Sequence, residues 1–394
     1  MSFEFHLPTL EDMRATGSND MLRMIDDDEF RSALITGCPG SGKTTVSIYR
    51  LVRLSREKKR VYLVTFQNML VLSIRALANI APQTDSIFDP LSVSTFNAWY
   101  KLQTGIYFNV DSPPTIEEIE RSLSNSKLVS QQIVEIIIDE GQDLPSCVFE
   151  TIPRYSNRVF IGADENQMLH SHGTKDGQIK SIITATFGPL INHDLGRNFR
   201  NTYETYRFAR QFLPRTADTA WDENILERLL RSKRRGIIPT VVTYRDSLLR
   251  DNHLLTALRN ADGNVAILCP LGKKSDKYPK SGEAVDEMYE FLLKNNIKAS
   301  RYHSDIDTPD NLERYVVTTF KSAKGMEFDE VLIPRINFFK KIAKEWYVAC
   351  TRAKKKVTVY RDLSSPQNDP IAGFDVDTYE SISLVVQPSS VATF

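Results

Sequence analysis

The sequence predicts an α/β protein of two domains, each built on a mostly parallel sheet with helices on both faces. Short aliphatic or β-branched runs alternate with helix-like segments, which is typical of parallel strands buried on both sides. The alternation occurs in two separate series along the 394 residues. A hydrophobic content of 41% is enough to fill more than one core.

The expected strands set the domain limits. The first series lies at 33–36, 61–65, 91–94, 133–138 and 159–161, and the second at 265–268, 297–300, 315–319, 330–333 and 356–360. A helix is expected over 282–294, and the proline-containing, acidic segment 101–132 predicts a small helical insertion. We therefore expect a first domain at 1–192, a second at 193–361 and a turn-rich C-terminal tail at 362–394.

Charge and cysteine content exclude little. Lysine plus arginine equal aspartate plus glutamate at 50 each, so net charge gives no argument for a polyanionic partner. Basic clusters at 58–60, 231–235 and 354–356 can supply a local field, but a solvated surface is the favoured explanation for each of them alone. The four cysteines have no metal-site spacing, and we expect no structural metal. Without a signal sequence or membrane span, we expect a cytoplasmic protein with no membrane partner.

The most informative segment is the octapeptide GCPGSGKT at 37–44, which follows an expected strand and opens an expected helix. Its glycines allow backbone N–H groups to surround phosphates, Lys43 reaches the terminal phosphates, and the Thr44 hydroxyl binds Mg²⁺. The segment predicts a nucleoside triphosphate site with these contact residues: Gly37, Gly40, Gly42, Lys43, Thr44 and Thr45.

A second signal is the apolar strand at 136–138, which is followed directly by acidic residues. Ligands of open α/β sheets bind at the carboxyl ends of the strands. Asp139 would hold Mg²⁺ through its water shell, and Glu140 would polarise the water that attacks the γ-phosphorus. The alternative is an acidic turn without catalytic function.

The phosphate loop and the sequence DEGQD at 139–143 together resemble the UvrD/Rep-like branch of superfamily 1 helicases, whose cores are two RecA-like domains that clasp ATP. Four further segments are similar to that family's motifs in the family's order. They are GADENQ at 162–167, NFRN at 198–201, TFKSAKGMEFD at 319–329 and YVACTRAK at 347–354.

The resemblance implies a role for each matched residue. Gln167 would sense the γ-phosphate, Phe199 would stack on adenine, and Arg200 would touch the γ-phosphate from the second domain. Glu327 would bond the ribose, and Arg352 would be the arginine finger. Catalytic groups would then come from both domains, so hydrolysis would be coupled to domain closure.

The resemblance also implies that single-stranded nucleic acid, DNA in preference to RNA, lies across both domains. Hydroxyls and amides would contact phosphates, and aromatic rings would stack on bases. The alternative for the aromatic residues is a place in the core beside the sheet. The candidates are Thr65, Phe66, Thr95, Phe96, Trp99, His172, Thr319 and Lys321.

The sequence departs from the family in three places. Histidines at 170 and 172 stand where larger relatives carry a base-stacking aromatic residue. No glutamine precedes the phosphate loop in the adenine-reading position, so a preference for ATP rests on the resemblance. The interval 305–314 is too short for an accessory domain, and 100–135 leaves room for a reduced one at most.

Two hypotheses of function follow. The first is an ATP-dependent, Mg²⁺-using translocase or helicase-like ATPase that acts on single-stranded nucleic acid with a minimal core. The second is a nucleotide-dependent switch or sensor subunit that controls a partner effector such as a nuclease, for example in a bacterial or phage defence system.

Overall fold

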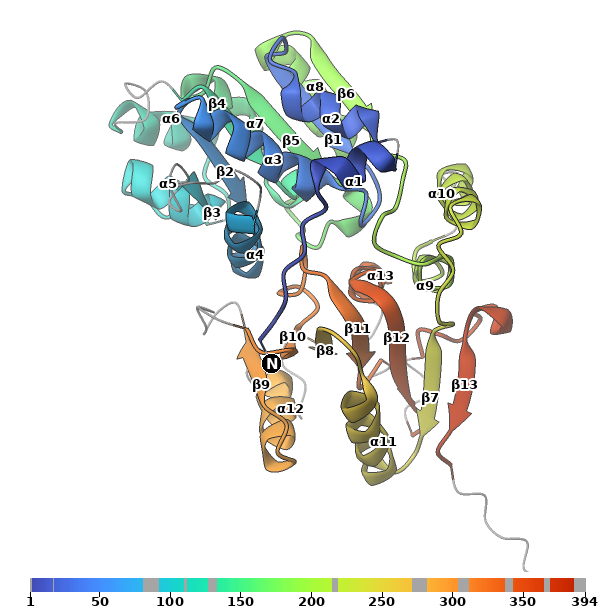
Figure 1. The fold of residues 1–394 in the computed structure, drawn as a ribbon. Coiled ribbons are helices and arrows are strands. Elements are labelled where there is room, and N and C mark those ends of the chain that lie inside the picture. The colour runs from blue at the N-terminus through green and yellow to red at the C-terminus, as the bar shows by residue number, and fades with distance from the viewer. Residues whose placement is uncertain are drawn as a thin grey trace, which may run out of the picture.

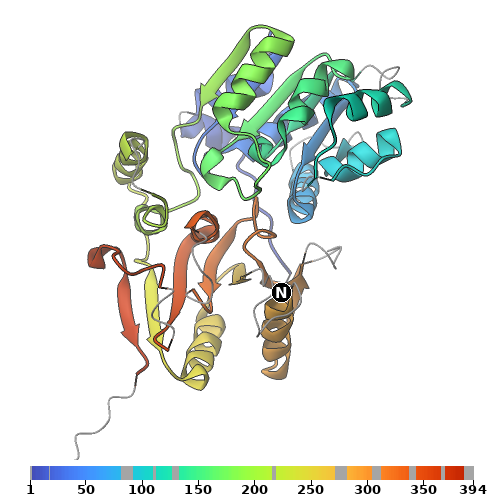
Figure 2. The same ribbon diagram turned by 180° about the vertical axis from the view of Figure 1, so that it is seen from behind.

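A computed structural model describes residues 2–16, 18–80, 92–109, 112–126, 133–214, 219–270, 282–303, 312–336, 343–364 and 369–385. It contains two α/β domains, which lie one above the other in Figure 1. A short N-terminal segment runs from the upper domain down to the lower one, and this course is visible in Figures 1 and 2. The predicted α/β class with two parallel sheets is confirmed.

The first sheet has six strands in the order β3-β2-β4-β5-β1-β6, and all of its pairs are parallel. Its strands are β1 (Ser32–Thr36), β2 (Val61–Thr65), β3 (Val93–Thr95), β4 (Glu135–Ile138), β5 (Val159–Ala163) and β6 (Leu190–Asp194). The phosphate loop follows β1 and the acidic segment follows β4, so both lie at the carboxyl edge of this sheet.

Helices cover both faces of the first sheet. One face packs against α1 (Leu10–Ala15), α2 (Asn19–Asp26), α3 (Lys43–Arg56) and α4 (Asn68–Ile80). The other packs against α5 (Phe96–Thr104), α6 (Ile116–Ser124), α7 (Ser146–Thr151) and α8 (Asp176–Phe187). Successive residues of β4 alternate between the two cores, with Ile137 in one and Ile136 and Ile138 in the other, which explains why the strand is uniformly apolar.

The second sheet has seven strands in the order β13-β7-β12-β11-β8-β10-β9, again all parallel. Its strands are β7 (Thr240–Tyr244), β8 (Val265–Cys269), β9 (Ala299–Tyr302), β10 (Tyr315–Thr319), β11 (Phe328–Ile333), β12 (Ala353–Asp362) and β13 (Glu380–Ser383). One face packs against α9 (Tyr203–Arg210), α10 (Thr219–Arg231) and α13 (Ala343–Cys350), and the other against α11 (Ser247–Asn260) and α12 (Glu283–Lys294).

Short 3₁₀ turns complete the described structure at η2 (Gly141–Asp143), η3 (Ile152–Arg154), η4 (Glu165–Gln167) and η6 (Val376–Thr378). One of them carries a predicted site residue, and another directly follows one. η2 follows the acidic end of β4, and η4 ends at Gln167.

Three strands differ from the prediction. β6 crosses the expected boundary at 192 and pairs with β1 in the first sheet. β7 lies between the two expected series of strands, where we expected no strand. β13 lies in the predicted tail, yet it pairs with β7 as the edge strand of the second sheet. The last part of that tail, 386–394, and residues 127–132 of the predicted insertion lie outside the described residues.

A buried ion pair connects α3 to the first sheet. Arg50 and Glu135 have no exposed side-chain surface, and the Arg50 Nε lies 2.5 Å from Glu135 Oε1. The Arg50 guanidinium also donates to the Met24 and Asp27 carbonyl oxygens at 3.0 and 2.8 Å. These contacts fix the helix that carries Lys43 and Thr44 against the strand that carries Asp139.

Candidate nucleotide-hydrolysis site

The phosphate loop connects β1 to α3, which begins at Lys43. Gly40 and Gly42 have φ angles of +73° and +99°, a region that favours glycine. The Lys43 ammonium donates to the Gly37 and Cys38 carbonyl oxygens at 2.6 and 3.1 Å, so it lies folded over the loop where the terminal phosphates would bind.

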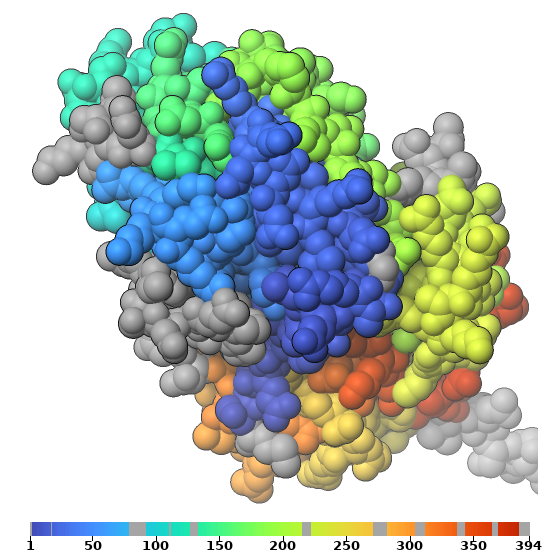
Figure 3. Space-filling model, turned by 45° about the horizontal axis from the view of Figure 1, so that its top comes forward, coloured from blue at the N-terminus to red at the C-terminus, as the bar shows by residue number. Residues whose placement is uncertain are grey.

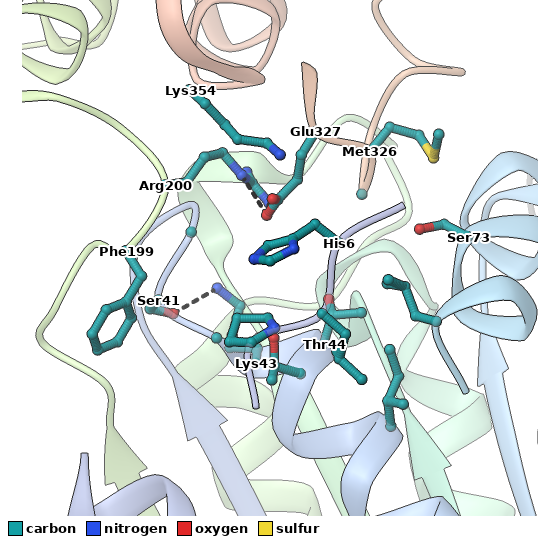
Figure 4. Close-up of a pocket in the computed structure, with 18 of the residues that line it drawn as sticks. His6, Ser41, Lys43, Thr44, Ser73, Phe199, Arg200, Met326, Glu327 and Lys354 are labelled. Atoms are coloured by element: carbon teal, nitrogen blue, oxygen red, sulfur yellow. Dashed lines mark hydrogen bonds and ion pairs between the residues drawn. The ribbon is translucent and has the colours of Figure 1, made fainter. Parts of the chain in front are cut away.

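A cavity of about 530 Å³ opens in front of this loop. Its walls come from the phosphate loop, from the second domain and from the N-terminal segment 3–8. In Figure 4, Lys43 and Thr44 lie on one side and the pair Arg200 and Glu327 lies on the other. The cavity includes these predicted site residues: Gly40, Gly42, Lys43, Thr44, Thr45, Glu140, Gln167, Phe199, Arg200, Glu327 and Arg352.

Thr44 and Asp139 meet as a metal site requires. The Thr44 hydroxyl donates to Asp139 Oδ2 at 2.7 Å. The second oxygen, Asp139 Oδ1, is buried without a hydrogen-bond partner within the described structure. Burial and the neighbouring Glu140 carboxylate raise the pKa of Asp139 to about 7. A hydroxyl beside a carboxylate with an unused oxygen fits a magnesium ion and its water shell.

Glu140 occupies a restricted position at the end of β4. Its φ angle of +60° is unusual for a residue other than glycine, and its side chain is buried. The Gln142 amide donates to its Oε2 at 2.6 Å, and the Lys324 ammonium lies 3.1 Å from the same oxygen. Burial acts to raise the pKa of Glu140, but Lys324 and Lys43 outweigh it and lower that pKa to about 2.

Lys324 is a site residue that the sequence motifs did not reveal. It belongs to the second domain, is fully buried, and donates to Asp143 Oδ2 at 2.5 Å and to the Gln167 carbonyl oxygen at 2.7 Å. The only signal in the sequence is its position inside the segment at 319–329 that resembles a family motif. Lys324 joins the acidic end of β4 to the second domain.

Gln167 and Arg352 form another bridge between the domains. The Gln167 amide donates to Asp164 Oδ2 at 2.6 Å, and the Arg352 guanidinium donates to Gln167 Oε1 at 2.6 Å. Burial and the nearby Arg200 lower the pKa of Arg352 to about 9. The residue predicted to sense the γ-phosphate therefore contacts the predicted arginine finger directly.

The chain between the sheets carries Phe199 and Arg200 past the phosphate loop. The Phe199 amide donates to the Gly40 carbonyl oxygen at 2.8 Å. The Arg200 guanidinium donates to Glu327 Oε1 at 2.8 Å and lies 2.7 Å from it through Nη2. The groups predicted to touch the γ-phosphate and the ribose are thus paired with each other.

Two of the predicted nucleic-acid contacts are wrong in this structure. Phe96 and Trp99 are 2% and 1% exposed and belong to the core beneath the first sheet, so neither ring can stack on a base. Their motif is the first turn of α5, where the Thr95 hydroxyl accepts from the Ala98 amide as the N-cap. Thr95 therefore caps the helix, and Phe96 and Trp99 lie on the face of the helix that packs into the core.

The structure places the other candidates as follows. Phe66 is half-buried, with its ring centroid 4.2 Å from that of His170, while His172 is exposed. Thr65 is buried, and its hydroxyl has no partner within the described part of the chain. Thr319 is buried and bonds Ser322, and Lys321 is half-buried. The candidates with exposed surface are Phe66, Thr95, His172 and Lys321.

The fold and this site define a P-loop nucleotide-binding protein of two domains. A family model described as "AAA domain" matches residues 27–173. An alignment of length 74, which covers 16% of this chain, shows 38% identity to the RecBCD enzyme subunit RecB of Chlamydia pneumoniae. The match spans only 7% of that relative's length. The family match covers both the phosphate loop and the acidic end of β4, and it supports a nucleotide-binding domain in the first part of the chain.

Two solved structures align with this chain at low similarity. Arterivirus nonstructural protein 10, a helicase in complex with DNA, aligns with 90% of this chain and 65% of its own, at 14% identity and a TM-score of 0.39. The C-terminal domain of a possible DNA helicase from Lactobacillus plantarum aligns with 46% of this chain and 98% of its own, at 16% identity and a TM-score of 0.32.

No helix in the described ranges is long and apolar enough to cross a bilayer.

Proposed function

We propose that this chain is a helicase-like ATPase of the UvrD kind, stimulated by single-stranded nucleic acid and acting on DNA in preference to RNA. The supporting observation is that one cavity collects the proposed phosphate-binding and catalytic groups of both domains. The first domain contributes Lys43, Glu140 and Gln167, and the second contributes Arg200 and Arg352. A nucleotide in this cavity would touch both domains at once.

The chain's own residues suggest how hydrolysis proceeds. The phosphate loop and Lys43 bind the phosphates, and Glu140 accepts the proton of the attacking water. Arg200 and Arg352 neutralise charge that develops on the transferred phosphoryl group. Mg²⁺ held by Thr44 and, through water, by Asp139 would supply further charge neutralisation on the phosphate oxygens.

The contacts of Lys324 suggest how hydrolysis is controlled. A carboxylate with a pKa of about 2 is a weak base, and among the groups that lower the pKa of Glu140, Lys324 has the largest effect, ahead of Lys43. Lys324 belongs to the second domain, so a change in domain arrangement would move it away from Glu140. Nucleic acid bound across both domains could favour that change. In the simplest scheme, domain closure alone would activate hydrolysis. Here the contact between Lys324 and Glu140 keeps Glu140 a weak base, so the two domains would also have to move apart at this contact.

Nucleotide hydrolysis measured against a panel of single-stranded, duplex and tailed DNA and RNA tests the proposed function. We expect single strands to raise the rate and Lys43→Ala to remove both basal and stimulated hydrolysis. A basal rate that depends on Lys43 but does not respond to any nucleic acid would contradict the proposal. No observation on the described residues favours the switch-subunit hypothesis.

A further inference from the structure

Residues 3–8 form an N-terminal strap, which is attached to both domains. Its first anchor is in the second domain, where the Phe3 amide donates to the Leu312 carbonyl oxygen at 2.8 Å. Asn264 bonds both backbone groups of the next residue, accepting from the Glu4 amide at 3.1 Å and donating to its carbonyl oxygen at 2.7 Å. The Phe3 ring packs edge-on against Phe328, with centroids 5.6 Å apart.

The other anchor of the strap is in the first domain. The Tyr49 hydroxyl of α3 donates to the Pro8 carbonyl oxygen at 2.9 Å. Leu7 is buried in the core that also contains Met13, and Thr9 caps α1. Both ends are therefore fixed by buried apolar side chains and by hydrogen bonds to the backbone. Figure 3 shows this dark-blue segment continuing from the first domain onto the second.

Between these anchors the strap lies along the nucleotide cavity, and His6 points into it. In Figure 4 the imidazole lies between Ser41 and Lys43 on one side and Arg200 and Glu327 on the other. The side chain is exposed and lines the cavity together with Asp12. An imidazole that faces a phosphate loop can donate an N–H to an anionic oxygen.

We propose that His6 donates a hydrogen bond to a phosphate oxygen of the bound nucleotide, and that the strap thereby links nucleotide occupancy to the second domain. This inference rests on the proposed function. The link is separate from Arg200 and Arg352, because it runs through the backbone from His6 to the Phe3 anchor. A ligand that orders the strap at His6 also restrains the Asn264 and Leu312 contacts.

Binding of a non-hydrolysable ATP analogue with Mg²⁺ tests the contact, with any affinity tag placed at the C-terminus. We expect His6→Ala to weaken binding five- to tenfold, His6→Gln to restore most of it by keeping an N–H donor, and His6→Phe to fail to do so. Glu11→Gln is the matched control, because Glu11 is exposed on α1 and lies outside the cavity. Unchanged binding in His6→Ala, or full restoration by His6→Phe, would overturn phosphate donation.

A second measurement needs no variant. Hydrogen exchange of residues 2–9 in the unaltered chain should slow when the analogue is bound, including at the Phe3 and Glu4 amides. Analogue binding that leaves this exchange unchanged would overturn the strap as a link while leaving the proposed function intact. Failure of the unaltered chain to bind the analogue at all would instead contradict the proposed function.

Discussion

The Arg352 guanidinium of the second domain donates to Oε1 of Gln167 in the first domain at 2.6 Å. Gln167 in turn donates to Asp164 at the end of β5. A charged group from one sheet is therefore held within hydrogen-bond reach of the other sheet's catalytic edge. Both residues line the nucleotide cavity, so only a small shift is needed to present Arg352 to a phosphate.

Removal of the Arg352 guanidinium should affect chemistry more than binding. We expect Arg352→Ala to lower kcat by about a thousandfold or more, because an arginine finger contributes that much to phosphoryl transfer. Binding of a nucleotide analogue should change by less than tenfold, since Lys43 and the loop amides remain. Steady-state hydrolysis and analogue titration measure the two effects, with the more exposed Lys355→Ala as control. Equal losses in kcat and binding would assign Arg352 to ground-state binding.

Removal of the Lys324 ammonium should raise the pKa of Glu140 and make it a stronger base. The double variant Lys324→Met with Asp143→Asn takes away the ammonium without leaving a buried, unpaired carboxylate at 143. We expect basal hydrolysis without nucleic acid to rise and the stimulation by single strands to shrink, because Glu140 regains basicity. Rate measurements with and without single-stranded DNA check this. A lower basal rate with unchanged stimulation would contradict the restraint on Glu140.

The Arg50–Glu135 pair should dominate the stability of the first domain. We expect Arg50→Met to lower the free energy of unfolding by about 3 to 5 kcal/mol, because it leaves the Glu135 carboxylate buried and unpaired. The exposed Arg154–Glu120 pair is a matched control, and Arg154→Met should cost about 1 kcal/mol or less. Denaturant unfolding monitored in both variants gives the comparison, and similar losses would contradict a special role for burial.

Asp176 should make stability depend on pH. Burial and the neighbouring Asp164 and Glu165 raise its pKa to about 7 in the folded state. The unfolded chain ionises near the ordinary value, so the folded state binds the extra proton and loses stability as pH rises between about 4 and 7. We expect Asp176→Asn to gain stability relative to the unaltered chain across that range and to level off above it. Thermal midpoints from pH 5 to 8 check the trend.

Much of the fold could be predicted because strands buried on both faces are uniformly apolar. β4 shows this with three consecutive isoleucines. β13 could not be predicted, because its sequence ESIS is exposed at the sheet edge and carries no apolar pattern. β7, with the sequence TVVTY, was missed because only two aliphatic residues mark it between helical segments. An edge strand is defined by the partner it pairs with, and that partner is distant in sequence.

Some residues of the candidate site could also be predicted from the sequence, and others could not. Lys43, Thr44, Asp139 and Glu140 could be located because each follows a recognisable strand. Trp99 was misassigned, since a motif containing aromatic residues does not reveal which side of its helix faces the core. Lys324 was missed because its partners lie in the first domain, and His6 because only the fold brings the N-terminal strap to the cavity.

The close packing of Gly40 against Phe199 and Arg200 predicts the phenotype of mutations at position 40. Its carbonyl oxygen accepts from the Phe199 amide, and a methyl group in place of its hydrogen would collide with the Cβ of Arg200. The chain has left the first sheet at Asp194, so Gly40 contacts the segment that connects the two sheets. A Gly40 substitution would displace this connecting segment as well as distort the loop. Alleles at this position should therefore resemble defects of interdomain motion rather than simple loss of nucleotide affinity.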